Sequence, residues 1–326
     1  MRLIKPSFEI WAQEEGLEGV YKQIERAGRV CYKSEDKITD TSAKDFVDRM
    51  IKSGHGAMLE HGTVYLILPV GYVQGGYGLE ESTVTKKYRE NSYSKVTYQD
   101  FGDSQRAYVT TNYRVIIEND WLMDLDYQCE PTEFHEKRVT VKFICDRGVS
   151  HEFVRHRVMS FAQESTRYCN YSKDKFGGEV TFIIPCWLNI KEGHYQYVHE
   201  TGPLGHDFYW TPEVSYDDLQ NGAGLLLESL AHSEAAYQEL LNKWNNKSHD
   251  KRFRTGYKGN PWTPQQARAV LPNSLKTELV MTGFVSDWNH FFDLRARGTT
   301  GAPHPQAKEL AEPLMKEFIA RKYINN

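Results

Sequence analysis

The chain has 326 residues, of which 40% are hydrophobic and 26% are charged, and its formal net charge is -4. This composition is typical of a soluble globular protein, and the length predicts about two domains, or one domain with insertions. A mildly acidic chain is not a general binder of polyanions, so a nucleic-acid role would need a local basic patch.

The five cysteines include no CxxC pair. Their odd number argues against a disulfide framework or a zinc knuckle, and we expect no metal site. Residues 1–6 contain no long apolar stretch, and no run approaches the ~18 apolar residues that a membrane span needs. We therefore expect a cytoplasmic protein without a membrane partner.

Two helices and a strand are predicted first. Residues 16–31 place Val20, Ile24 and Ala27 on one face, and a second helix over residues 41–53 ends at a glycine. Residues 63–68 are strand-like. The next segment, residues 70–105, is rich in Gly, Tyr, Ser and Lys and lacks a clear period, so we expect inserted loops with short helices.

Strands are expected in the middle of the chain, at residues 107–117 and 138–144. Four more helices are predicted, at residues 150–155, 219–244, 275–292 and 305–322. A further helix start lies at Thr263, where a threonine cap precedes a proline and Gln266 can close a capping box. Residues 170–215 are aromatic and irregular. Helices at both ends around a middle block of strands predict an α+β fold.

Residues 155–167 carry the strongest functional signal, because three arginines, a histidine and two serines occur in thirteen positions. An arginine guanidinium presents five fixed donors that match phosphate oxygens in pairs. A cluster this dense predicts a pocket for more than one phosphate group. The alternative is a nucleic-acid-binding module that uses Arg155–Arg167 on phosphates.

The same stretch matches the RHR-x7-S signature of the flavin-dependent thymidylate synthases, with Ser165 in the serine position. The chain resembles this family in three further elements, which follow the family order. They are Gly54-His55 with Glu60-His61 (GH-x4-EH), Ala267-Arg268-Ala269-Val270-Leu271-Pro272 (AR-x-VLP) and Leu294-Arg295 (LR).

The resemblance implies a fold and an activity. The fold would be a central antiparallel sheet flanked by helices, in a single domain over residues 1–326 with insertions near 70–137 and 170–210. The reaction would be the reductive methylation of dUMP to dTMP, with the methylene from methylenetetrahydrofolate, the hydride through reduced FAD, and NADPH as reductant of the flavin. The assembly would be a homotetramer with shared active sites. A catalytically degenerate flavoprotein is the alternative within the family.

The resemblance also implies residue roles by position. The FAD would be held by His55, Glu60, Arg155, His156, Arg157, Val158 and His290. The dUMP would be held by Glu152, Gln163, Ser165, Arg167, Arg268 and Arg295. Arg295 would also be the catalytic residue, because a fixed cation beside the pyrimidine stabilises charge that develops at its carbonyl.

Some positions depart from the family pattern. Gln163 stands where shorter members carry glutamate and Glu164 follows it, so either side chain is a candidate for dUMP. Glu152 replaces a glutamine that usually precedes the motif. Pro185-Cys186 resembles the Pro-Cys nucleophile of unrelated thymidylate synthases, but a thiolate needs a basic or helix-terminal setting. We expect Cys186 to be a buried structural residue.

Overall fold

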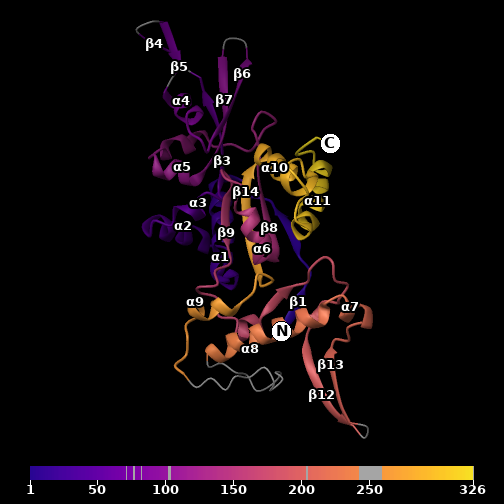
Figure 1. Ribbon diagram of the computed structural model, residues 1–326. Helices are drawn as coiled ribbons and strands as arrows, with labels where there is room; N and C mark the ends of the chain where they lie inside the picture. The colour runs from indigo at the N-terminus through magenta and orange to yellow at the C-terminus, as the bar shows by residue number, and fades with distance from the viewer. Residues whose placement is uncertain are drawn as a thin grey trace.

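The centre of the molecule is a four-stranded antiparallel sheet, in the order β2-β8-β14-β9. The computed structural model describes residues 1–70, 72–75, 78–81, 83–101, 104–202, 205–241 and 259–325. The strands are β2 (Ser7–Trp11), β8 (Arg138–Asp146), β14 (Lys276–Phe284) and β9 (Ser160–Gln163). Helices cover this sheet (Figure 1), so the predicted α+β fold with a central antiparallel sheet is confirmed.

Each face of the central sheet packs on helices. On one face lie α6 (Arg147–Phe153), α10 (Val285–Phe292) and α11 (Pro305–Ala320), around a core that includes Phe143, Trp288 and Phe291. On the other face, α1 (Gly16–Tyr32) sets Ala27 and Val30 against Val280. Each fully buried large apolar side chain contributes about 1.5–3 kcal/mol to the free energy of folding. Packing against the two helical layers therefore stabilises the sheet that carries the motif.

A second sheet packs against α1. It has the order β3-β7-β6 and consists of β3 (Thr63–Pro69), β7 (Ser104–Asn112) and β6 (Lys95–Phe101). Its apolar side packs on α1 and on α2 (Ser42–Lys52), and both of these helices were predicted. The segment over residues 70–105 also holds β4 (Tyr72–Gly75), β5 (Gly78–Glu81) and α4 (Thr83–Arg89). The short helix expected in this segment is present as α4, but most of the expected loops are strands, because the strands around it are short and polar.

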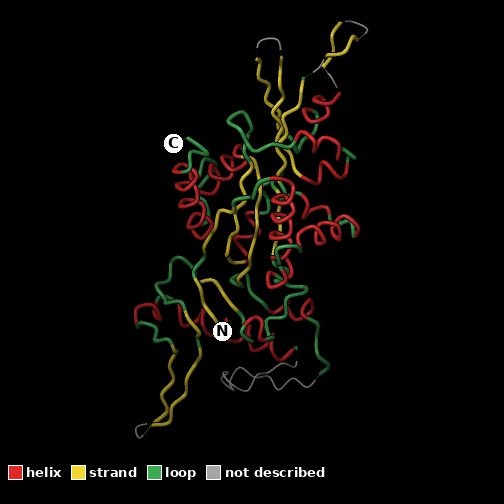
Figure 2. The backbone as a smooth tube through the Cα atoms, turned by 180° about the vertical axis from the view of Figure 1, so that it is seen from behind, coloured by secondary structure: helices red, strands yellow, loops and turns green. Residues whose placement is uncertain are grey.

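The third part of the molecule packs the first strand of the chain against elements from residues 181–240. It consists of β1 (Arg2–Ile4), β10 (Thr181–Ile183), β11 (Gly193–His194), β12 (Gln196–Gly202), β13 (Gly205–Thr211) and α8 (Ala223–Leu240). Leu3, Phe182 and Tyr237 lie in its core. The β12–β13 hairpin projects from this end and the β6–β7 hairpin from the other (Figure 2). Residues 170–215 are therefore more regular than expected.

Two predicted helices differ from the structure. Residues 275–292 form β14 followed by α10, because eight of the nine β14 positions are buried and a strand buried on both faces shows no alternation. The helix predicted over residues 219–244 is interrupted at Gly222, whose φ of +94° separates α7 (Tyr216–Gln220) from α8, and residues 242–244 of that prediction lie outside the described residues. The predicted 107–117 strand ends at Asn112, which caps α5 (Tyr113–Glu118) by accepting from the Val115 amide.

The predicted capping box at Thr263 is present and starts α9 (Pro264–Ala267). A short helix, α3 (Gly56–Leu59), precedes β3. Short 3-10 helices occur at Glu35–Lys37, Leu122–Tyr127, Asp174–Phe176 and Arg268–Val270, and a π-helical turn at Asp293–Arg297. Within the described ranges, no helix has the length and apolar character needed to cross a bilayer.

Candidate active site

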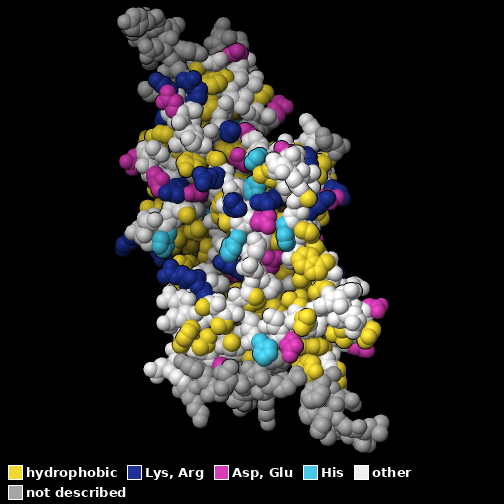
Figure 3. All heavy atoms as spheres, in the orientation of Figure 1, with side chains coloured by type: hydrophobic (Ala, Val, Ile, Leu, Met, Phe, Trp, Pro, Cys, Tyr) yellow, Lys and Arg dark blue, Asp and Glu magenta, His cyan; other side chains and the backbone are white. Residues whose placement is uncertain are grey.

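The arginine motif begins where α6 ends. Asp146 caps α6 by accepting from the Val149 amide at 2.8 Å, so β8 runs directly into this helix. The chain then turns and enters β9, which pairs with β14. Figure 3 shows acidic, basic and histidine side chains gathered on the face over this region.

Four of the predicted site residues meet at the end of α6. Arg295, in the π-helical turn, forms an ion pair with the Glu152 carboxylate through Nη1 and donates to the Glu152 carbonyl through Nη2 at 3.0 Å. Its Nε donates to His156 Nε2 at 3.1 Å. The His156 ring lies 6.0 Å from the ring of His290, centroid to centroid. The structure thus brings together Glu152, His156, His290 and Arg295.

His156 is a neutral acceptor in this cluster. It is buried, and burial together with the charges of Arg295 and His290 lowers its pKa to about 4. A neutral imidazole has one ring nitrogen free to accept, which matches the donation from Arg295. His156 therefore accepts a hydrogen bond that orients Arg295, and it adds no second positive charge beside the guanidinium.

Arg155 and Arg157 flank His156 and are both exposed. Neither guanidinium forms an ion pair with another described residue. Val158 follows with a φ of +76°, in the left-handed region that a β-branched residue rarely adopts. Strain of this kind persists where surrounding structure imposes it and concentrates at ligand sites. The segment presents two unpaired cations and a fixed backbone turn to solvent.

A second group of predicted residues lies along the end of β9. The Gln163 amide donates to Ser150 Oγ at 2.8 Å and to Thr277 Oγ1 at 3.3 Å. Ser165 Oγ accepts from the Arg167 amide at 3.3 Å, and Arg268 Nη1 donates to Thr166 Oγ1 at 3.1 Å. The end of β9 and the residues after it thus carry Gln163, Ser165 and Arg167. Arg268 joins this group through its bond to Thr166.

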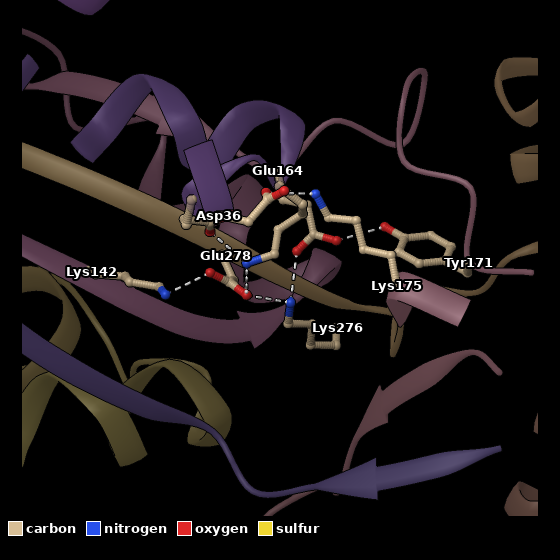
Figure 4. Close-up of polar contacts among 9 residues, drawn as sticks. Asp36, Lys142, Glu164, Tyr171, Lys175, Lys276 and Glu278 are labelled. Carbon is tan, nitrogen blue, oxygen red and sulfur yellow. Dashed lines mark hydrogen bonds and ion pairs between the residues drawn. The ribbon is translucent and has the colours of Figure 1, made fainter. Parts of the chain in front are cut away.

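Glu164 points away from this group into a buried ionic network (Figure 4). Its side chain is 1% exposed and pairs with Lys276 Nζ at 2.8 Å, while Tyr171 donates to it at 3.0 Å. Lys276 also pairs with Glu278 at 2.6 Å. Because both carboxylate oxygens of Glu164 are engaged inside the protein, Gln163 is the one of the two side chains left near the surface.

Glu278 is the centre of this network, which the sequence analysis missed. It also pairs with Lys33 at 2.8 Å and with Lys142 at 2.6 Å. Burial alone would raise the pKa of Glu278, but Lys276, Lys33 and Lys142 outweigh it and hold the pKa well below its ordinary value. The network ties β8, β14 and the end of α1 to the residue that precedes Ser165.

The last two predicted residues lie in the α2–α3 region. His55 is exposed at the start of α3, and Glu60 pairs with Arg114 at 2.6 Å. Within the described part of the chain, neither side chain bonds to the Arg295 cluster or to the β9 group. One chain therefore presents the predicted residues as three separate groups.

None of the cysteine thiols is activated. Burial raises the pKa of Cys31 and of Cys129 to about 11, and it raises those of Cys145, Cys169 and Cys186 as well. Cys186 is exposed, so the expectation that it is buried was wrong. Among the residues that the structure describes, no cluster of three His, Cys, Asp or Glu side chains is arranged to hold a metal ion.

These features define an α+β protein with an arginine-rich segment between α6 and β9, at the edge of the central sheet. The family model for "Thymidylate synthase complementing protein" matches residues 93–321, more than half of the chain. The chain belongs to this family.

Similar proteins include a flavin-dependent thymidylate synthase of Corynebacterium aurimucosum, 22% identical over 308 residues, which are 94% of this chain and 78% of the relative. Another, from Mycobacterium leprae, is 30% identical over 158 residues, 46% of each chain. The solved UMP/dUMP methylase PolB from Streptomyces cacaoi, bound with 5-Br dUMP, aligns over 98% of this chain and 93% of its own with 16% identity and a TM-score of 0.40.

Proposed function

We propose that the protein converts dUMP to dTMP by reductive methylation, with methylenetetrahydrofolate as one-carbon donor and NADPH as reductant. The observation that carries this proposal is the pair of unpaired, exposed arginines, Arg155 and Arg157, on either side of a neutral His156. The family membership and the names of the similar proteins support the same activity.

The residues present fit FAD. Two guanidiniums without ion-pair partners match a diphosphate, and the turn at Val158 exposes backbone groups beside them. FAD, when bound, supplies the hydride chemistry, while the protein supplies position and charge. Arg155, His156, Arg157 and Val158 would hold the cofactor, with His290 beside them.

His55 and Glu60 would complete the flavin site from another subunit. In one chain they lie in a different group from the arginine motif, and a closed symmetric oligomer can bring such groups together. A homotetramer with shared active sites is the assembly that we propose.

The nucleotide would lie against the β9 group. Ser165, Arg167 and Arg268 supply a hydroxyl and two cations for the phosphate, and Gln163 supplies an amide. Arg295, with Glu152 and His156 fixing its orientation, would meet the pyrimidine and stabilise negative charge at a carbonyl oxygen.

The test begins with cofactor binding. Arg157→Ala should weaken FAD binding by about 1.5–3 kcal/mol, because a charged contact to phosphate is lost. Arg321→Ala is the matched control, since Arg321 is a cation at the end of α11 that pairs with Glu317 at 2.8 Å. Parent protein supplied with FAD, dUMP, methylenetetrahydrofolate and NADPH should form dTMP. Flavin binding without dTMP formation would identify a degenerate flavoprotein. If Arg157→Ala binds FAD as tightly as the parent protein, Arg157 does not contact the cofactor.

A further inference from the structure

A cavity of about 720 Å³ lies beside α1 and α2. Pockets that bind small molecules typically have volumes of about 300–1,000 Å³. Five cationic side chains and no carboxylate occur in its described lining, and the cations are Arg29, Lys37, Arg49, Lys52 and Lys175. His55 lines the same cavity. None of the five cations has a role in the proposed chemistry.

Three of these cations are unpaired. Arg29 is neutralised by the buried Glu25 at 2.7 Å, and Lys175 pairs with Asp36 at 3.1 Å. Lys37, Arg49 and Lys52 form no ion pair with any residue in the described ranges. The cavity therefore carries a local positive charge in a chain whose net charge is -4, which attracts anions over short distances.

A simpler explanation accounts for part of this charge. Arg49 and Lys52 lie in the last turn of α2, where cations stabilise the helix dipole. Lys37 is not on that helix and belongs to the turn Glu35–Lys37, so the dipole does not explain it. Cations from two separate elements facing one cavity indicate a ligand instead.

The rest of the lining is aromatic and apolar. Phe46 and Met50 form part of the wall, and the guanidinium of Arg49 lies 5.5 Å from the centre of the Phe46 ring. Tyr32 also lines the cavity, and its ring packs at 5.2 Å on that of Tyr168. A flat ring with anionic groups on a flexible chain would fit such a mixed surface.

The cavity is linked to residues of two of the predicted groups. His55, from the flavin group, lines it, and the guanidinium of Arg167, from the nucleotide group, lies 5.4 Å from the ring of Tyr168. Tyr32 in the cavity wall is therefore joined to Arg167 by two successive contacts, through the ring of Tyr168. These contacts place the cavity close to the nucleotide group of the same chain.

We propose that this cavity binds the anionic tail of a co-substrate, with its phosphates or carboxylates on Lys37, Arg49 and Lys52. The inference rests on the proposed function, because NADPH and methylenetetrahydrofolate both join a ring system to several anionic groups. The shared chemistry is a flexible polyanion, and the 2′-phosphate of one and the glutamate carboxylates of the other are its two sources.

The test compares two double variants of the FAD-loaded protein. Arg49→Gln/Lys52→Gln removes two charges from the cavity. Lys22→Gln/Lys44→Gln removes the same charge from α1 and α2 outside it, where the lysines pair with Glu14 and Asp48 at 2.8 and 2.7 Å. Calorimetric titration with inorganic tripolyphosphate at low salt should show about tenfold weaker binding in the cavity variant, and little change in the control.

Two further comparisons identify the source of the anion. Loss of the preference for NADPH over NADH in the cavity variant would assign the cavity to the 2′-phosphate. Loss of the preference for triglutamate over monoglutamate methylenetetrahydrofolate would assign it to the carboxylates. Unchanged tripolyphosphate binding, or weaker binding with both preferences intact, overturns the inference. The proposed function fails separately, if the parent protein forms no dTMP.

Discussion

Glu152 holds Arg295 twice, with its side-chain carboxylate on Nη1 and its backbone carbonyl on Nη2 at 3.0 Å. These contacts join the end of α6 to the π-helical turn that follows α10. Arg295 is therefore oriented before any ligand binds, and preorganised charge of this kind is the most effective form of electrostatic stabilisation. The same carboxylate also offsets part of the positive charge that the nucleotide would meet.

The first prediction concerns that carboxylate. Glu152→Gln keeps an acceptor for Arg295 but removes a negative charge near the proposed dUMP site, so dUMP should bind about two- to fivefold more tightly. Equilibrium titration with dUMP measures this, and Glu317→Gln, which removes an exposed carboxylate paired with Arg321, is the control. Weaker binding in Glu152→Gln would show that the carboxylate itself accepts a bond from the nucleotide.

The second prediction separates two arginines. Arg167→Ala should raise the dissociation constant of dUMP, because phosphate binding is similar in the ground and transition states. Arg295→Ala should slow the single-turnover oxidation of the flavin by roughly a hundredfold, with a smaller effect on binding. Arg295→Lys keeps the charge but not the planar array of donors, so its single-turnover rate should lie between those of the parent and Arg295→Ala. If Arg295→Ala weakens only binding, Arg295 positions the nucleotide and has no electrostatic role in the reaction.

The sequence predicts some elements well because their cause is local. The amphipathic spacing of Val20, Ile24 and Ala27 predicts α1, and the capping residues at Thr263 predict the start of α9. The strand β14 was missed because burial on both faces removes the period that distinguishes a strand from a buried helix. Tertiary packing decides such segments.

The site shows the same division. Arg155, His156 and Arg157 are contiguous, so the motif is visible in the sequence. The contact of His156 with Arg295 depends on how α10 packs against α6, and the family resemblance supplied Arg295. The network on Glu164 had no signal at all, because Lys276 lies 112 residues away from it and a Lys-x-Glu pair is typical of a solvated strand.

The third prediction tests that network. Glu164→Gln leaves Lys276 with one carboxylate partner instead of two in a buried setting, so we expect the free energy of unfolding to fall by about 2–3 kcal/mol. Urea unfolding measures it against Glu312→Gln, which removes an exposed pair with Lys316 and should cost less than about 0.5 kcal/mol. Equal stability of the two variants would contradict a supporting role for the network.

The fourth prediction is a pH dependence from His61. This side chain is fully buried, and burial together with the Arg138 charge lowers its pKa from 6.5 to about 3. Below pH 6.5 the unfolded chain takes up a proton that the folded chain refuses, so the stability from this group is lost as the pH falls. The slope is roughly 1.4 kcal/mol per pH unit.

His61→Asn tests the assignment, because an asparagine amide can still bond to Thr282 Oγ1, which His61 Nδ1 contacts at 2.8 Å. Urea unfolding between pH 6.5 and 5 should show a shallower loss of stability in the variant than in the parent. Glu278 does not interfere, because its stabilising charge is lost only at lower pH. Parallel pH profiles for the two proteins would mean that another group is responsible.

We propose that this chain, loaded with FAD, methylates dUMP reductively. The most direct measurement is an anaerobic single turnover, in which the reduced protein is mixed with dUMP and methylenetetrahydrofolate while flavin absorbance and dTMP are followed together. We predict that flavin oxidation and dTMP formation occur in equal amounts, and that both require dUMP and the folate. Flavin oxidation without dTMP, or no oxidation when both substrates are present, would contradict the account.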